Sequence, residues 1–98
     1  MIQKTIIERM LDISTIHLTE STRQWLMDNP YPLSPYEKSD YGWFIPIPED
    51  YKVNPNEPTF QSIPEDMKQV LDYAVSIDVQ WIMFDCESLV EPNLPIYE

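Results

Sequence analysis

The stretch Val79-Gln-Trp-Ile-Met-Phe-Asp85 is the densest apolar run in the sequence, and it decides the fold. It follows the clearest helical segment of the chain and ends at an acid. Its apolar side chains do not alternate cleanly, since all four residues from Trp81 to Phe84 are large. Such a strand is typical of a position inside a sheet, where its neighbours protect it. We therefore predict that it is the central strand of a small α/β domain.

The segment before this strand has the strongest helical periodicity. Its apolar residues recur at spacings of three, one, three and one, namely Met67, Val70, Leu71, Ala74 and Val75. This spacing places them on one face of an amphipathic helix. Ser62 and Glu65 have the spacing of a capping box, and Pro64 suits a first turn. We predict a helix from Ser62 to Ser76 or Ile77.

Two more strands and another helix are predicted upstream. The β-branched run Ile13–Leu18 predicts a first strand, and Thr19 is a good N-cap for a helix that Trp25 anchors and Asn29-Pro30 ends. In Tyr41–Ile47, apolar side chains alternate onto one face, which predicts a second strand. Pro46 lacks an N–H, so this strand lies at an edge or its Pro46 nitrogen points away from a partner.

These elements give the order β-α-β-α-β within a single domain, residues 1–98. Three strands and two main helices predict a small two-layer α/β (α+β) sandwich. Residues 1–11 carry apolar side chains at helical spacing, which predicts an N-terminal helix, with an extended lead-in to the next segment as the alternative. Residues 30–40 and 48–61 are rich in proline and are predicted as ordered loops. The tail after Asp85 is expected to pack back through Leu94 and Ile96.

Charge narrows the functional classes. Seventeen acidic residues face six basic ones, which gives a formal net charge of −11. Direct binding to nucleic acid or to an anionic membrane needs clustered Lys and Arg, and the six cations do not cluster. A basic protein partner fits this charge, although plain solubility explains it too. Cys86 is the only cysteine, so we expect no intrachain disulfide, and we expect a cytoplasmic protein without a signal peptide or membrane span.

The sequence offers few residues for catalysis. Asp85 and Glu87 follow the central strand, where α/β sheets place ligand sites, and they could hold Mg²⁺ if Asp12 or Asp50 supplied a third acid. A solvated strand exit is the simpler interpretation. His17, the only histidine, could pair with Ser14 or Cys86, but no nucleophile motif surrounds it. One glycine rules out a phosphate-binding loop, and we expect no cofactor and no metal.

Tyrosines in loops rich in proline and acids are a more informative feature. They are Tyr31, Tyr36, Tyr41, Tyr51 and Tyr97. Tyrosine is enriched at the energetic centres of protein interfaces. The alternative is that these rings pack against the small core. We expect Tyr36 and Tyr51 to belong to a binding surface.

Several short motifs occur in an order that resembles a family of short, acidic bacterial proteins of unknown function, often carried on plasmids, phages and integrated elements. The motifs span residues 12–97, namely Ser14-Thr-Ile-His-Leu18, Trp25-Leu26, Tyr41-Gly-Trp-Phe44, Pro48-Glu-Asp50, Ile63-Pro-Glu-Asp66, Phe84-Asp85 and Leu94-Pro-Ile-Tyr97. The segment Cys86–Pro92 departs from the family's small, glycine-containing turn. The resemblance implies a mobile-element setting and carries no catalytic residue.

Together these features predict a non-enzymatic accessory protein that binds a basic partner. The most specific version of this prediction is an inhibitor of a host nucleic-acid-binding defence system, such as an anti-CRISPR or anti-restriction protein that mimics DNA. The expected acidic contacts are Glu49, Asp50, Glu65, Asp66, Asp72, Asp85 and Glu87. The alternatives are a small metal-dependent hydrolase that uses Asp85 and Glu87, and a purely structural or oligomerising module.

Overall fold

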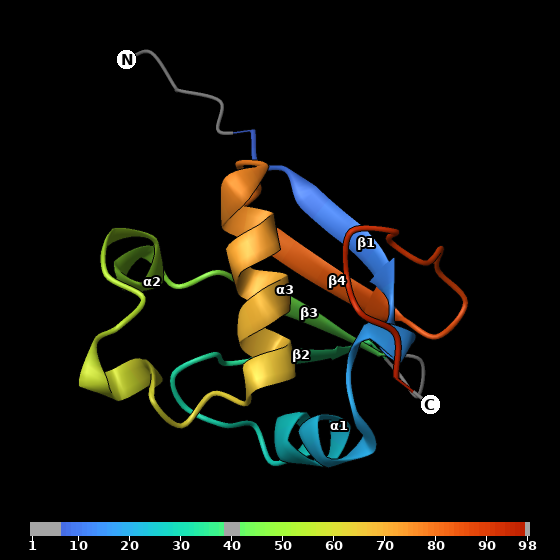
Figure 1. The fold of residues 1–98 in the computed structure, drawn as a ribbon, viewed down its shortest axis with the longest axis horizontal. Helices are drawn as coiled ribbons and strands as arrows, with labels where there is room; N and C mark the ends of the chain where they lie inside the picture. Colours follow the sequence, from blue (N-terminus) through green and yellow to red (C-terminus); the bar gives the residue numbers. More distant parts are fainter. Residues whose placement is uncertain (1–6, 39–41, 98) are drawn as a thin grey trace, which may run out of the picture.

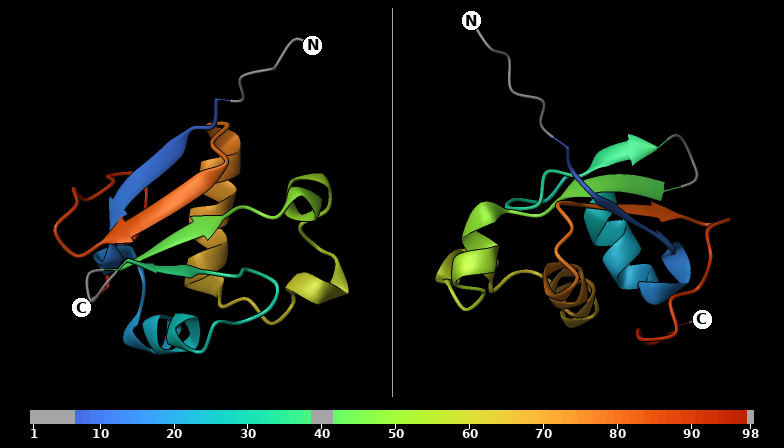
Figure 2. Two further views of the ribbon diagram at one scale, coloured as in Figure 1. Left: turned by 180° about the vertical axis from the view of Figure 1, so that it is seen from behind. Right: turned by 90° about the horizontal axis from the view of Figure 1, so that it is seen from above.

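A computed structural model describes residues 7–38 and 42–97 as an α+β fold. A four-stranded open sheet carries its helices on one face, as the view from above shows (Figures 1 and 2). The strands lie in the order β1-β4-β3-β2. The described elements are β1 (Met10–Ser14), the 3-10 helix η1 (Thr15–His17), α1 (Glu20–Met27), β2 (Tyr36–Lys38), β3 (Gly42–Pro46), α2 (Glu49–Val53), the 3-10 helix η2 (Pro58–Phe60), α3 (Glu65–Ser76) and β4 (Trp81–Asp85).

The prediction of a central last strand is confirmed. β4 lies between β1, with which it is parallel, and β3, with which it is antiparallel. Ile82 and Phe84 are fully buried on the helix-covered face, whereas Trp81 and Met83 are half-buried on the other face. The alternation that the sequence hides is therefore present in the fold, because the open face of the sheet also carries large apolar side chains.

The amphipathic helix α3 is confirmed, but its predicted cap is wrong. Met67, Val70, Leu71 and Ala74 are buried, as the spacing predicts. The helix begins at Glu65, with Pro64 in the N-cap position and no side-chain capping bond. Ser62 is thus outside the helix, and the predicted capping box does not form.

The first strand lies earlier than predicted. β1 covers Met10–Ser14, and the Ser14 hydroxyl accepts the Ile16 N–H, which begins the turn of η1 and ends the extended chain. The predicted N-terminal helix falls partly outside the described residues. Within them, residues 7–9 are not helical, and Met10 and Leu11 belong to β1, so that part of the prediction is wrong.

The predicted cap of α1 is confirmed, because the Thr19 hydroxyl accepts the Thr22 N–H at 3.2 Å. The predicted anchor is wrong. Leu26 is 1% exposed and anchors the helix, whereas Trp25 is only half-buried against the core.

Two regions predicted as loops contain regular structure. β2 adds an edge strand that pairs with β3, and α2 and η2 form two short helices between β3 and α3. The pairing also explains Pro46. Ile47 donates its N–H to Gln80 on the β4 side, so by alternation Pro46 faces the β2 side, beyond the end of that short strand. No ladder bond is lost there.

The C-terminal segment 86–97 returns over β1 and η1 (Figure 1). Leu89 accepts the Ser14 N–H, and Tyr97 donates its N–H to the Ile16 carbonyl at 2.8 Å. Leu94 is buried, as predicted, whereas Ile96 is 55% exposed and does not pack back. Among residues 7–38 and 42–97, none of the helices is long and apolar enough to cross a membrane.

Candidate protein-binding cleft

The structure divides the predicted acidic residues between two ends of the sheet. Gly42 pairs with Asp85, and Pro46 pairs with Trp81. Because α2 follows β3, Glu49 and Asp50 lie beyond the end of β4 that is opposite Asp85 (Figure 1). These residues do not form one continuous acidic surface.

The buried side chain of Tyr51 connects α2 to α3. Its hydroxyl donates to Asp72 at 2.6 Å, and its ring meets Phe60 edge-on, with 5.1 Å between the ring centroids. Burial raises the pKa of the Tyr51 phenol far above its usual range, and the Asp72 and Glu65 carboxylates raise it further. The ring is 2% exposed, so the prediction that Tyr51 belongs to an exposed binding surface is wrong.

Tyr51 nevertheless brings four predicted acids to one region. Glu49 and Asp50 precede it on α2, and Asp72 and Glu65 act on its hydroxyl from α3. All four are exposed. We call Glu49, Asp50, Glu65 and Asp72 the acidic face.

Asp66 is the exception among the predicted acids. It is 8% exposed, and its two carboxylate oxygens accept the Thr19 N–H at 2.7 Å and the Thr22 hydroxyl at 2.6 Å. It thus supplies to α1 the contact that a capping-box acid would make within one helix. The prediction that Asp66 belongs to a binding surface is wrong, because its carboxylate links two helix N-termini inside the protein.

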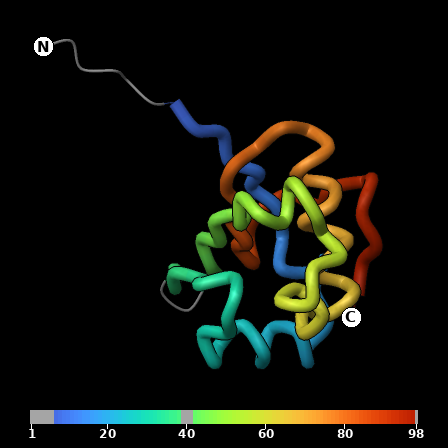
Figure 3. Tube along the Cα trace, turned by 90° about the vertical axis from the view of Figure 1, so that its left-hand side faces the viewer, coloured from blue at the N-terminus to red at the C-terminus, as the bar shows by residue number. Residues whose placement is uncertain are grey.

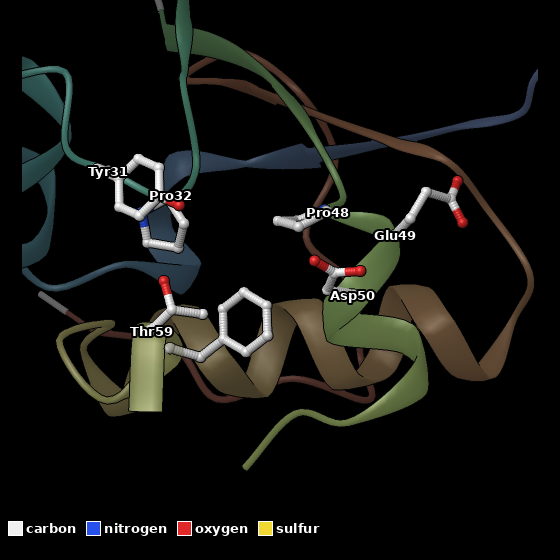
Figure 4. A pocket seen from close by; sticks show the side chains of 7 residues that line it. Tyr31, Pro32, Pro48, Glu49, Asp50 and Thr59 are labelled. Carbon is white, nitrogen blue, oxygen red and sulfur yellow. The ribbon is translucent and has the colours of Figure 1, made fainter. Parts of the chain in front are cut away.

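A small cleft opens beside the acidic face. Its volume is about 190 Å³, and its lining combines aromatic, proline and acidic residues: Tyr31, Pro32, Pro48, Glu49, Asp50, Thr59 and Phe60. In Figure 4, the Asp50 carboxylate lies across the cleft from Tyr31 and Thr59, whereas Glu49 points away from the others. Glu49 also pairs with Lys52 at 3.5 Å, so Asp50 is the acid that faces the cleft.

The walls of the cleft are fixed to the core. Leu33 is 1% exposed and anchors the loop that carries Tyr31, whose own side chain is 80% exposed. Phe60, which forms the floor with η2, is 2% exposed and packs on Tyr51. Figure 3 shows the α2 and η2 segment running beside α3 on this side of the molecule. The cleft is therefore preformed rather than assembled by a mobile loop.

Size and chemistry define what the cleft can hold. Cofactor and drug-sized pockets measure roughly 300–1,000 Å³, so this cleft suits a single side chain. A Lys or Arg side chain meets an opposite charge at Asp50 and a ring at Tyr31, and cations bind favourably to aromatic faces. Sequence analysis singled out Asp50, Glu49 and Tyr31. It missed Thr59 and Phe60, which no local pattern marks as partners of α2.

At the opposite end of the sheet, Asp85 forms its contacts within the protein. Lys38 of β2 reaches across Gly42 to bind Asp85, with 2.7 Å between Nζ and Oδ2, and the Glu87 N–H donates to the other oxygen. The Lys38 hydrogen bond holds the pKa of Asp85 below its usual range. Asp12 accepts the Ser88 hydroxyl, and Asp50 lies at the opposite end of the sheet. The described residues hold no group of three His, Cys, Asp or Glu suited to a metal ion.

His17 has a structural place. It is 1% exposed, its Nε2 accepts the Glu91 N–H at 2.8 Å, and its Nδ1 lies 2.8 Å from the Pro95 carbonyl oxygen, to which it donates. Both ring nitrogens therefore hold the C-terminal segment. Because both nitrogens already form hydrogen bonds, neither is available to the predicted partners. The Ser14 hydroxyl accepts the Ile16 N–H instead, and Cys86 is exposed.

Comparison with known proteins finds a family that matches most of the chain. A family model described as the C-terminal domain of a family of unknown function, DUF5983, matches residues 10–98. No curated protein and no solved structure matches the chain. The match agrees with the expected membership of a family without an assigned activity, whereas the mobile-element setting stays a prediction.

Proposed function

The chain belongs to the family of unknown function DUF5983, because the model of that family's C-terminal domain matches residues 10–98. We propose that the chain is a non-enzymatic protein-binding module that holds a basic side chain of its partner in the Tyr31–Asp50 cleft. The observation that supports this most strongly is the position of the Asp50 carboxylate in a preformed cleft opposite an 80% exposed tyrosine. An exposed aromatic ring beside an acid is a typical anchor for Arg or Lys.

The acidic face extends the same preference around the cleft. Glu65 and Asp72 lie on α3, seven residues apart and therefore on one side of the helix. Together with the net charge of −11, they attract a basic surface over a longer range and raise the association rate. We infer that the partner presents a basic surface.

The most specific version of the proposal concerns the kind of basic partner. Proteins that bind nucleic acid carry clustered Lys and Arg for the phosphates. An acidic face can occupy such a groove as DNA would, and a protein that did so would block a nucleic-acid-binding defence system. We propose this role, as an anti-CRISPR or anti-restriction protein of a mobile element acting in the cytoplasm, on the strength of the charge and the cleft.

A capture experiment tests the proposal. The immobilised protein is exposed to host lysate, and the partner identified by mass spectrometry is then titrated against wild type and variants at rising salt. We expect Asp50→Lys to weaken binding by about tenfold or more, since a like charge replaces the cleft acid, and we expect added salt to weaken the wild type. Glu87→Lys makes the same charge change at the far end of the sheet.

The two variants separate a site from general acidity. The proposal requires Glu87→Lys to change the affinity by less than about twofold, because exposed charges beyond a Debye length are largely screened. Equal losses of affinity in the two variants would show that Asp50 contributes no more to binding than another exposed acid. Binding that ignores salt would contradict an electrostatic mode altogether.

A further inference from the structure

β2 is an edge strand with an open backbone. It is the last strand of the described sheet and pairs only with β3, with Tyr36 opposite Phe44, Glu37 opposite Trp43 and Lys38 opposite Gly42. The bond from Ile47 to Gln80 shows that the odd-numbered residues of β3 bond toward β4, so the even-numbered ones bond toward β2. By alternation, the N–H and C=O of Glu37 point away from the sheet. An exposed edge of this kind is a template for another strand.

A groove runs beside this edge. It has a volume of about 440 Å³ and is lined by Leu26, Met27, Asn29, Pro35, Tyr36, Glu37 and Trp43. Leu26 and Trp43 are nearly buried and form an apolar floor, whereas Met27 and Tyr36 are each 59% exposed. Met27 at its exposed position can adapt to a partner's side chains, whereas the Tyr36 ring lies 6.1 Å from the Trp81 ring on the other face of the sheet.

Charge indicates which partner fits. Glu37 is exposed, and it is the only charged residue among those that line the groove. A segment with a basic side chain beside an apolar one is therefore complementary to it. A second copy of this chain fits poorly, because a two-fold pairing centred on Glu37 would place the two Glu37 side chains opposite each other, and each copy carries a charge of −11.

We propose that β2 receives an extended segment of a partner protein as an added strand. The partner's backbone bonds to the N–H and C=O of Glu37, an apolar side chain enters the groove over Leu26 and Trp43, and a Lys or Arg two residues away meets the Glu37 carboxylate. Side chains two residues apart lie on the same face of a strand, which sets this spacing. This contact is independent of the Tyr31–Asp50 cleft and adds a sequence preference that the cleft alone does not provide.

A defined peptide tests the proposal without knowledge of the partner. The probe is the blocked peptide Thr-Val-Thr-Lys-Thr-Val-Thr, which places Val and Lys on one face. Binding is followed by amide NMR, together with hydrogen exchange at Glu37. We expect the Glu37 amide to exchange about fivefold more slowly when the peptide is bound, because its N–H becomes a donor. The same peptide with every backbone amide N-methylated keeps its side chains and is expected to bind about tenfold more weakly.

Two substitutions at Glu37 separate the contribution of its backbone N–H to peptide affinity from that of its side-chain charge. Glu37→Pro removes the edge N–H, which an edge strand tolerates, and should reduce peptide affinity about tenfold. Glu37→Gln keeps the backbone and should reduce it about threefold. Asp50→Lys should leave it unchanged within about twofold, so a failure of the cleft is distinguishable from a failure of this edge.

Three results would overturn the added-strand proposal. One is equal binding of the N-methylated peptide, which would show that the side chains act without backbone pairing. Another is a shift pattern that leaves Glu37 and Trp43 unaffected. The third is a homodimer, seen by sedimentation, that Glu37→Pro dissociates, since the occupant of β2 would then be a second copy.

Discussion

Gly42→Ala is expected to abolish folding or to lower the free energy of unfolding by roughly 4 kcal/mol or more, a large part of the stability of a small domain. A Cβ atom built on Gly42 would lie 1.7 Å from the carbonyl oxygen and 2.6 Å from the carbonyl carbon of Phe84. Both atoms are backbone of the central strand, so no side chain can rotate away. Relief requires β3 and β4 to separate, and their pairing joins β2 to the rest of the sheet.

Urea unfolding followed by tryptophan fluorescence measures this effect. Glu37→Ala is a suitable control, because it also ends in an alanine side chain but at an exposed edge position where a Cβ is already present, and it should change stability by less than about 0.5 kcal/mol. A Gly42→Ala protein as stable as wild type would contradict the described contact between β3 and β4.

Asp66→Ala is expected to lower the free energy of unfolding by roughly 3 kcal/mol. The substitution leaves the Thr19 N–H and the Thr22 hydroxyl without their acceptor, and the Thr22 side chain is 1% exposed. Each unsatisfied buried group costs about 1–3 kcal/mol. Asp66→Asn keeps one acceptor oxygen and turns an amide donor toward the other contact, so we expect about half to two-thirds of the loss.

Glu65→Ala is the matched control for Asp66. Both acids lie in the first turn of α3, where they interact with the helix dipole, but Glu65 is exposed. Its removal should cost about 0.5 kcal/mol or less. Chemical denaturation of the three variants separates the interhelical contact from the dipole. Equal losses for Asp66→Ala and Glu65→Ala would show that the buried contact contributes nothing.

Local signals predicted the elements that depend on their own residues. The periodicity from Met67 to Ala74 gave α3, the Thr19 hydroxyl gave the start of α1, and the apolar run that ends at Asp85 gave the central strand. In each case a side chain and its partner lie within about one turn of helix, or the apolar residues are continuous along the segment.

Long-range contacts decided what the sequence could not show. β2 has three residues and exists because β3 offers it a partner, and α2 is held by the contact of Tyr51 with Asp72. The Ser62 and Glu65 spacing was a local signal that tertiary structure overrode. The helix begins after Pro64, and its neighbouring acid, Asp66, serves a different helix.

The candidate site shows the same division. Composition and the Pro48-Glu-Asp turn drew attention to Glu49 and Asp50, and loop composition to Tyr31. That Asp50 faces Tyr31 while Asp66 is buried follows from how α2, η2 and α3 pack, which no spacing along the chain records. The predicted acidic surface is therefore larger than the real one, and no pattern in the sequence predicted the cleft.

We propose that the Tyr31–Asp50 cleft recognises a basic side chain, and an amide NMR titration with N-acetyl-arginine amide is the sharpest test of this proposal. We expect the largest shifts at Tyr31, Asp50 and Thr59, and we expect Asp50→Asn to remove them and N-acetyl-glutamine amide not to produce them. Shifts of equal size at distant exposed acids such as Glu87, unchanged by Asp50→Asn, would contradict it and leave the acidity without a specific site.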